Sequence, residues 1–590
     1  MYLNQKQLRW AFTAAWFLAP TAWAQPYFYS VVNSASYSKD SIAPGSIFTA
    51  TGYGLGPGPL LQAGSYPLPN ELGGTSINVT VGSSTLPCPM FYTSGTQVAA
   101  ILPSSTPPGD AMLTPSYRGV VGFPTHIVVA GSAFGIYSAD SSGIGPGAFT
   151  GVNYDLKGFQ NAARPGDTVI LWGTGLGAID GSDNDVPSGG KQFSGVEVFV
   201  GTSAARISYA GRSGCCAGLD QIAFEIPASV SGCFVPVAVR SGGVVSNFVT
   251  LAVDSAGTSC VNPPPALPAS ALIRALNGDE LKLGVIAIGP TLILDGAGFQ
   301  FSSDMVPHLS ALLHAPVSDD DARSLIGVYR SRDIRSMERL LRKYNVSRSQ
   351  VTPRFLRSLR AAIGIDQHGA AAAFGTSSGL AGLVSVFGPH LVSPGTCIVT
   401  KEPRVAPYGA HTHALDAGQT LNFSGPSGQR TMTLVRGQYQ LSLGSGFPDA
   451  NVTPGTYAVT GNGGNDIPKF AASLKVTSGL TWINKTAIGA IDRTQPLTVM
   501  WTGASVPGFV LIGGSVHTIG ENITLVCVED SAKGAFTIPP FVLAALPAAE
   551  AQYAFFFIAP HPLSTPVNIP GLDLAYFVNA SSDYQAIEVR

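Results

Sequence analysis

A serine in a glycine-flanked pentapeptide is the first candidate for chemistry. Gly375-Thr376-Ser377-Ser378-Gly379 matches the GxSxG pattern, in which a sharp turn between a strand and a helix presents a nucleophilic serine. Such a serine also needs a distant histidine and acid, held in place by the fold. The surrounding residues are rich in Ala, Gly and Ser, and no alternation of strands and helices surrounds them. We therefore expect no nucleophile here, and no other motif marks the chain as an enzyme.

Acidic residues form the densest group of potential metal ligands. Asp180, Asp183 and Asp185 fall within one six-residue segment just after a predicted strand. Hard oxygen ligands at this density suit Ca²⁺. The EF-hand pattern fails, because the segment lacks its sixth-position Gly and its Glu at position twelve. A solvated turn is the favoured interpretation, and a calcium site on these three carboxylates is the alternative.

Two further patterns suggest ligands but have simpler explanations. His411-Thr412-His413 would place two imidazoles on one face of a strand, with Asp416 nearby, as in the start of a zinc site. No third ligand follows at close spacing, so exposed or hydrogen-bonded histidines are expected. Gly173-Thr174-Gly175-Leu176-Gly177 is GxGxG and lacks the GxGxxG spacing and the following helix of a nucleotide-binding loop. A tight glycine turn accounts for it better.

The composition indicates the framework that must position such residues. The chain has 590 residues, of which 69 are Gly and 44 are Pro, and only 12% are charged. Its length suggests several domains, and many short strands joined by Gly and Pro turns fit this composition. The formal net charge of −2 gives no reason to expect a strongly charged partner for the whole molecule.

Residues 1–24 resemble an export signal. Lys6 and Arg9 precede an apolar stretch, and Ala22-Trp23-Ala24 forms a small-x-small cleavage site before Gln25. No later apolar run reaches the roughly 18–20 residues that cross a bilayer as a helix. We expect an exported protein without a transmembrane segment.

The first half of the chain contains an internal repeat. Residues 43–56, APGSIFTATGYGLG, recur as residues 164–177, RPGDTVILWGTGLG, and further matching blocks follow in the same order. Each copy combines short β-branched and aromatic runs, alternating apolar positions and frequent glycine turns. This pattern predicts two tandem immunoglobulin-like β-sandwiches, over residues 25–137 and 138–260.

The repeat resembles a known family. The NSASY, APGS and GYGLG segments of the first copy, and RSGCCAGLDQIAFEIP at residues 212–227, are similar to uncharacterised secreted modules of acidobacterial proteins, which are related to TIG/IPT immunoglobulin-like domains. The resemblance continues more loosely towards the C-terminus. It implies a β-sandwich fold and export, and it implies no activity, because the family has none established.

The seven cysteines are expected to form disulfides in an oxidising compartment. Because the count is odd, at least one thiol stays free or pairs between chains. Between corresponding positions the second repeat is seven residues longer than the first, and the extra residues fall within GRSGCCAG at 211–218. We expect Cys215 or Cys216 to bond to Cys233 and so fix this loop. Two alternatives remain open, namely the spare cysteine with Cys260, and Cys260 with Cys397.

The rest of the chain is predicted as a β region over 261–400, with a helical insertion at 318–363, followed by one or two sandwiches over 401–590. The insertion carries eleven Lys or Arg and five Asp or Glu. Binding of nucleic acid or an anionic surface is the sharper interpretation. A solvated helix face is favoured, so we expect no nucleic acid.

Together these observations predict a mainly β, non-enzymatic exported protein with a structural, adhesive or ligand-binding role. A polysaccharide or a surface protein would be its partner, and no cofactor is expected apart from the calcium alternative. One alternative function is a secreted hydrolase with its residues scattered over the C-terminal half. The other is a carbohydrate-binding accessory protein, with exposed aromatics such as Trp482 and Trp501 as its platform.

Overall fold

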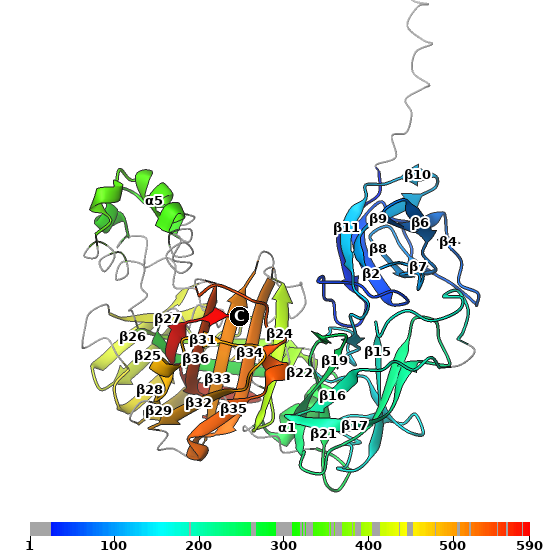
Figure 1. Ribbon diagram of the computed structural model, residues 1–590. Coiled ribbons are helices and arrows are strands. Elements are labelled where there is room, and N and C mark those ends of the chain that lie inside the picture. Colours follow the sequence, from blue (N-terminus) through cyan, green and yellow to red (C-terminus); the bar gives the residue numbers. More distant parts are fainter. Residues whose placement is uncertain are drawn as a thin grey trace, which may run out of the picture. The chain divides into compact units, whose positions relative to one another are not determined.

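The computed structural model (Figure 1) is mainly β, which confirms the predicted fold class. The export signal predicted at 1–24 lies outside the described residues. The structure describes residues 25–187, 190–260, 267–290, 309–318, 321–322, 325, 334–352, 355, 359, 368–379, 382–383, 391–403, 413–435, 437–444, 452–477, 480–503, 508–518, 521–551, 553–561, 565–580 and 582–590. Among these, no helix is long and apolar enough to cross a membrane.

The chain forms two compact units whose boundary does not follow the repeat. Unit one comprises the described residues up to Gly135 together with Thr174–Phe193 and Gly211–Asp220. Unit two comprises Ile136–Gly173, Ser194–Ala210 and the chain from Gln221 onwards. Two loops of the second repeat therefore belong to the unit that the first repeat builds.

Unit one contains an antiparallel sandwich of two sheets. The first sheet has the order β1 (Tyr27–Asn33), β2 (Ile47–Tyr53), β8 (Gln97–Ile101), β7 (Met90–Thr93) and β3 (Leu61–Gln62). The second contains β10 (Val120–Val121), β9 (Gly109–Tyr117), β5 (Thr75–Val81) and β4 (Glu71–Leu72), with β11 (Thr125–Val129) on β9 and β6 (Ser84–Pro87) on β5. Alternate residues of each strand point inward, so Phe48, Ile77, Val79 and Leu113 meet in one buried core.

The ten strands of the second repeat form one hydrogen-bonded sheet, whereas those of the first repeat form two. The order is β14 (Leu156–Lys157), β13 (Phe149–Gly151), β15 (Thr168–Thr174), β18 (Asp220–Glu225), β17 (Ser203–Arg212), β16 (Val196–Val200), β19 (Gly232–Ser241) and β20 (Val244–Val245), with β12 (Gly135–Ile136) on β15 and β21 (Val249–Val253) on β19. Strand β15 corresponds to β2 of the first repeat, and both lead into the glycine turn found in the sequence.

The insertion of the second repeat lies in unit one and is bracketed by a buried ion pair, which we call the Arg212–Asp220 clamp. Arg212 Nη1 lies 3.2 Å from Asp220 Oδ1, and neither side chain reaches solvent. The guanidinium donates to the carbonyl oxygens of Gly45 at 2.8 Å and Gly177 at 2.9 Å. Oδ2 of Asp220 accepts the amides of Gly175 and Leu176, each at 2.8 Å. The clamp thus joins turns of both repeats.

Asp220 titrates abnormally because it is buried. Burial raises its pKa to about 6, against the opposing effects of Arg212 and of the amides of Leu176 and Gly175. The carboxyl is therefore ionised at neutral pH, where its charge balances Arg212. Mildly acidic conditions would therefore protonate the Asp220 carboxylate.

Two small sheets, of three and two strands, and two large ones make up the described C-terminal half. One has the order β29 (Phe470–Val476), β28 (Gly455–Gly461), β25 (Thr420–Gly425), β26 (Gly428–Val435), β27 (Gln438–Gly444), β23 (His368–Ser378), β22 (Glu280–Pro290) and β37 (Leu574–Asn579). The other has the order β24 (Thr396–Pro403), β34 (Glu521–Asp530), β33 (Phe509–His517), β36 (Ala554–Pro560) and β38 (Asp583–Ala586). The predicted division at residue 400 is wrong, because the first of these sheets combines strands from both sides of it and β24 of the second spans it.

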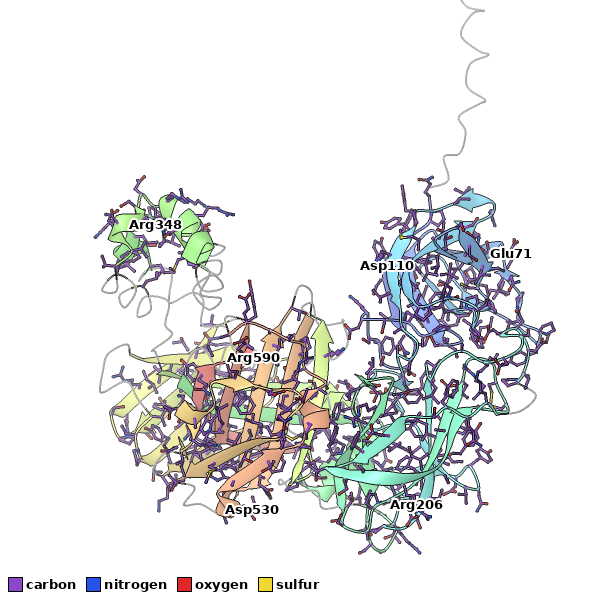
Figure 2. All side chains as sticks on the ribbon, viewed as in Figure 1. Glu71, Asp110, Arg206, Arg348, Asp530 and Arg590 are labelled. Carbon is purple, nitrogen blue, oxygen red and sulfur yellow. A yellow bond between two sulfur atoms is a disulfide. The ribbon has the colours of Figure 1, made fainter. Side chains whose placement is uncertain are left out.

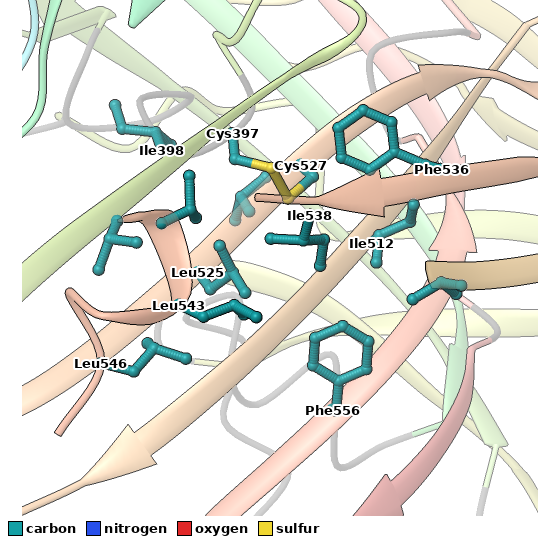
Figure 3. Close-up of a cluster of buried hydrophobic side chains, with 14 of the residues drawn as sticks. Cys397, Ile398, Ile512, Leu525, Cys527, Phe536, Ile538, Leu543, Leu546 and Phe556 are labelled. Atoms are coloured by element: carbon teal, nitrogen blue, oxygen red, sulfur yellow. A yellow bond between two sulfur atoms is a disulfide. The ribbon is translucent and has the colours of Figure 1, made fainter. Parts of the chain in front are cut away.

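The long-range pairing explains why the division failed. Strand β22 pairs in parallel with β37, nearly three hundred residues later, with Leu283 opposite Leu574. In the other sheet, Cys397 on β24 lies opposite Cys527 on β34, above a core that includes Leu525 and Phe556 (Figure 3). Local patterns show that such strands exist but do not show their partners.

The helical insertion is described in part. Helix α5 (Ile334–Arg342) lies within the helical insertion predicted at 318–363, and its Met337 and Leu341 are buried in one cluster with Leu325 and Leu359. Two other α-helices have defined limits among the described residues, α1 (Ala269–Leu276) and the short α8 (Pro540–Leu543). Much of the predicted insertion after Thr352 lies outside the described residues.

Candidate functional site

The three carboxylates considered for calcium do not gather. Asp183 accepts hydrogen bonds from the amide of Ser104 at 2.6 Å and from its hydroxyl at 2.7 Å. Asp180 pairs with Lys191 at 3.1 Å, and Asp185 is exposed. Among the described residues no three Asp, Glu, His or Cys side chains lie close enough to hold a metal ion. The geometry therefore gives the calcium alternative no support, since Asp183 bonds to Ser104 and so connects the loop of the second repeat to a turn of the first.

Ser377 does not lie at a nucleophile elbow. It falls within β23, which runs from His368 to Ser378 and pairs with β22 and β27. An elbow presents its serine at an exposed sharp turn, whereas Ser377 is paired opposite Leu281 of β22, one residue before β23 ends, and is only 2% exposed. His413 has an exposed side chain and contributes its carbonyl oxygen to the amide of Thr376, while His411 lies outside the described residues.

The cysteines pair differently from the favoured prediction. Cys233 bonds to Cys260, Cys397 to Cys527 and Cys215 to its neighbour Cys216, while Cys88 is a buried free thiol. A bond from Cys215 or Cys216 to Cys233 was wrong, and so was the Cys260–Cys397 alternative. The insertion loop is instead bracketed by the Arg212–Asp220 clamp within unit one.

The tryptophans proposed as a sugar platform are buried. Trp482 on β30 (Thr481–Trp482) lies opposite Trp501 on β32 (Leu497–Thr502), and each is only 3% exposed. Their indole nitrogens donate to Asn484 Oδ1 and to the carbonyl oxygen of Ser531. Both rings stabilise the core of the C-terminal sheets, so the predicted platform is wrong at these positions.

Exposed aromatic rings gather instead at one edge of the sandwich in unit one, where Tyr27, Tyr29 and Tyr53 form what we call the tyrosine cluster. The ring centroids of Tyr27 and Tyr29 are 4.9 Å apart, and those of Tyr27 and Tyr53 are 6.1 Å apart. Tyr29 is 64% exposed and Tyr53 is 51% exposed. Three rings in contact at the surface form an apolar patch of the kind found at interaction sites.

Local backbone features create the cluster. The ladder between β1 and β2 shifts register between Phe28 and Ser30, so Tyr29 is an extra residue with no partner on β2. Such a bulge redirects a side chain. Tyr27 remains opposite Tyr53, and the strands approach so closely that a Cβ on Gly52 would lie 2.0 Å from the Tyr27 carbonyl oxygen. The repeated glycine of the motif is therefore required for the approach of β1.

Hydrogen bonding orders two of the rings. The hydroxyl of Tyr27 donates to that of Tyr29 at 3.0 Å. This hydrogen bond is the main cause that raises the pKa of Tyr27, so its phenol stays neutral at physiological pH. Neutral hydroxyls can both donate and accept hydrogen bonds at the rim of an apolar patch.

A row of polar side chains crosses the same sheet next to the cluster. Ser30 on β1 lies opposite Thr51 on β2, and Thr51 lies opposite Gln97 on β8. Residues opposite each other in a ladder point to the same side of the sheet. Thr51 is exposed and the other two are half-buried, so hydroxyl and amide groups accompany the rings.

Tyr29 also lines a shallow groove between β1, residues 39–42 and β11. The groove has a volume of about 190 Å³, and its polar lining includes Lys39, Ser41 and His126. His126 is held by Asp110, with Nε2 2.8 Å from Oδ1, and Asp110 is labelled in Figure 2 on unit one. The arrangement offers an aromatic face, neutral hydrogen-bonding groups and charged groups within one region of one sandwich.

Comparisons with known proteins identify no family. No family model matches the chain, and no curated protein matches it. Among solved structures, a Bacteroides ovatus SGBP-B from a mixed-linkage glucan utilization locus, in complex with a heptasaccharide, is 8% identical, covers 91% of this chain and 96% of that chain, and has a TM-score of 0.12. Domains 5–6 of the S-layer protein SbsC are 14% identical, with coverage of 39% and 98% and a TM-score of 0.15. Sidekick-1 immunoglobulin domains 1–5 are 10% identical, with coverage of 94% and 99% and a TM-score of 0.11. Scores of this size carry no argument about function.

Proposed function

We propose that this is an exported, non-enzymatic protein that binds a polysaccharide through the tyrosine cluster. The observation that carries the proposal is the set of three contacting rings, two of them more than half exposed, beside a polar row and a groove. Tyrosine offers an apolar face and a polar tip at one site. A sugar ring has the matching chemistry, because its C–H groups pack on an aromatic face while its hydroxyls need hydrogen-bonding partners.

The polar groups around the cluster support a neutral sugar ligand. Ser30, Thr51 and Gln97 provide donors and acceptors without charge, as the edge hydroxyls of a pyranose require. Lys39 and His126 would contact the flanking part of a longer chain in the groove. A purely apolar partner would leave these polar groups without hydrogen bonds, at a cost in free energy.

Export is supported by the disulfides. Cys233–Cys260 and Cys397–Cys527 join residues far apart in the sequence, and such bonds persist in oxidising compartments. The signal predicted at residues 1–24 points the same way. An exported protein would encounter polysaccharides outside the cell.

The hydrolase alternative gains no support from the described residues. Ser377 lies within a paired strand, and no three metal-ligating side chains come together among the residues described. An activity screen on the polysaccharides used below would test this part of the proposal, because release of reducing sugar would contradict a non-enzymatic role.

Binding should be measured on the exported chain from Gln25 onwards by affinity electrophoresis and calorimetry. The probes are soluble polymers based on β-1,4-linked glucose, xylose and mannose. Combined Tyr29→Ala and Tyr53→Ala substitution should weaken binding at least about tenfold, because each stacked ring contributes about 0.5–1.5 kcal/mol beyond its buried area.

The matched control is Leu61→Ala, since Leu61 is an exposed apolar residue on β3, at the opposite edge of the same sheet. It should bind like the parent chain. Equal affinities for the parent and the double tyrosine variant would overturn the proposed site. Binding to none of the polymers would overturn the ligand class.

A further inference from the structure

A second group of exposed aromatic and apolar side chains lies on the second repeat, in unit two. Tyr154 is 64% exposed, and its ring centroid is 6.2 Å from that of Trp172, with the rings inclined by 32°. Val152 and Leu156 flank Tyr154 in the sequence and are also exposed. We call Tyr154 and Trp172 the second aromatic pair.

The pair sits on the strands that correspond to those of the tyrosine cluster. Trp172 belongs to β15, the counterpart of β2, and occupies the position of Thr51 in the repeated motif. Strand β13 pairs with β15 as β1 pairs with β2, and Tyr154 lies in the turn that follows β13. Both repeats therefore place exposed aromatic rings beside their first strand pair.

Trp172 is held with its ring on the outer face of the sheet. Its neighbours Val169 and Leu171 are fully buried in the core, so the alternation of the strand directs Trp172 to the other side. Its indole nitrogen donates to the hydroxyl of Thr150 at 3.1 Å. The polar group of the indole is thus satisfied, and the half-buried ring keeps a fixed orientation.

The backbone at Tyr154 is held in an unfavourable conformation. Its φ is +63°, in the left-handed region that bulky side chains rarely adopt. Its amide donates to the carbonyl oxygen of Gly151, and this bond helps to maintain the turn. Strain of this kind concentrates at functional sites, where it fixes a side chain in place.

A polar group accompanies the pair, as Ser30, Thr51 and Gln97 accompany the tyrosine cluster. Lys157 Nζ lies 2.9 Å from Asp155 Oδ2, which also accepts a hydrogen bond from Asn161 Nδ2 at 3.0 Å. The hydrogen bond from Lys157 is the main cause that lowers the pKa of Asp155, which stays ionised at neutral pH. The half-exposed carboxylate can accept hydrogen bonds from two hydroxyls.

We propose that the second aromatic pair, together with Asp155 and Asn161, is a second site for a sugar of the same polysaccharide, so that the chain binds its ligand at two sites. This inference rests on the proposed function. Rigid aromatic faces and a carboxylate that accepts hydroxyl hydrogen bonds are what a pyranose ring requires. Two weak sites on one chain bind a polymer much more tightly than either site binds a short oligosaccharide.

The test counts bound oligosaccharides by calorimetry on the chain from Gln25 onwards, with the hexasaccharides of β-1,4-linked glucose, xylose and mannose as probes. The variant is Tyr154→Asn, because Asn tolerates positive φ and removes the ring without disturbing the turn. Trp172→Phe is a second variant that keeps much of the packing. Val244→Ala, an exposed apolar residue on β20 of unit two, is the control.

We expect two hexasaccharides per parent chain, one in Tyr154→Asn and one in the Tyr29→Ala, Tyr53→Ala variant. The corresponding polymer should bind the parent about 100-fold more tightly than the hexasaccharide does, and either variant should lose this gain. One hexasaccharide in the parent, unaffected by Tyr154→Asn, would overturn the second site and leave the proposed function standing. If the parent binds one hexasaccharide and only Tyr154→Asn loses it, the tyrosine cluster is not a binding site and the second aromatic pair is. Binding of none would overturn both.

Discussion

The two repeats share a glycine turn, but the leucine amide of that turn donates its hydrogen bond to a different kind of acceptor in each. In the first repeat, the amide of Leu55 donates to the carbonyl oxygen of Gly95 at 3.1 Å. In the second repeat, the corresponding amide of Leu176 donates to the carboxylate of Asp220 at 2.8 Å. Both leucines are buried, so each amide needs a partner inside the protein. A neighbouring backbone group suffices in one repeat, and a buried charge replaces it in the other.

The replacement has a structural consequence, because a buried carboxylate needs a counter-charge. Arg212 provides it, and its guanidinium also bonds to carbonyl oxygens of Gly45 in the first repeat and Gly177 in the second. The seven extra residues of the second repeat carry this arginine and the loop that ends at Asp220. A short insertion thus converts a local turn into a connection between two repeats. Buried ion pairs of this type specify an arrangement more than they stabilise it.

Asp220→Ala tests most directly whether the turn of the second repeat depends on the buried carboxylate. The substitution removes the carboxylate that balances the buried charge of Arg212, and with it the acceptor of the Gly175 and Leu176 amides. We expect unit one to lose about 3–5 kcal/mol of unfolding free energy. Urea-dependent hydrogen exchange, read by mass spectrometry on peptides of unit one, measures this value separately from unit two.

The control is Thr96→Ala, because Thr96 corresponds to Asp220 in the first repeat. The Thr96 side chain is exposed, and its backbone carbonyl, which accepts a hydrogen bond from the Gly52 amide, is kept in the variant. It should change stability by no more than about 0.5 kcal/mol. Equal losses in the two variants would contradict the different roles that we assign to these positions.

The disulfide between Cys233 and Cys260 has no counterpart in the first repeat. It links residues 27 positions apart, and its loss should lower the unfolding free energy of unit two by about 3–4 kcal/mol in the chain-entropy model. Combined Cys233→Ser and Cys260→Ser substitution followed by hydrogen exchange checks this value. Peptides of unit one should keep their protection, and a matching loss there would show that the two units unfold together.

A pH titration sharpens the comparison, because only the second repeat places a titrating group at the turn. The folded pKa of Asp220 is about 6, above that of the unfolded chain, so the folded state binds the proton more tightly between about pH 4 and 6. This group therefore stabilises unit one as the pH falls through 6, by up to about 3 kcal/mol, and the contribution disappears as the pH rises above 6.

The measurement compares the parent with Asp220→Asn, which keeps an acceptor oxygen for the turn and cannot titrate. The stability of the parent relative to Asp220→Asn should increase from pH 7 to pH 4. A parent that becomes relatively less stable over this range would show that the ion pair with Arg212 outweighs burial and lowers the pKa.

The sequence predicts the mainly β fold class well, because it depends on local patterns of glycine and alternating apolar residues. It also locates the seven-residue insertion, by comparison of the two copies. It does not reveal the partner of Cys397, since Cys527 lies 130 positions away on a strand whose pairing is set by the tertiary fold.

The tyrosine cluster escapes prediction for a related reason. The spacing of Tyr27 and Tyr29 suggests one face of a strand, but their contact with Tyr53 depends on cross-strand register and on a bulge that has no clear sequence signature. Trp482 and Trp501 mislead in the opposite direction, because large aromatic residues suit a core as well as a surface. Cross-strand neighbours, and not residue types alone, decide which rings reach solvent.

The smallest expected effect concerns the bond between Cys215 and Cys216, the most unusual residues of the insertion. Adjacent cysteines close almost no chain, so their bond restricts the unfolded state very little. Cys215 is exposed, whereas Arg212 and Asp220 on either side of the loop are fully buried. Combined Cys215→Ser and Cys216→Ser substitution should therefore change the unfolding free energy of unit one by less than about 1 kcal/mol in the same hydrogen-exchange experiment. A loss comparable to that of Asp220→Ala would show that the disulfide, and not the ion pair, positions the loop between the repeats.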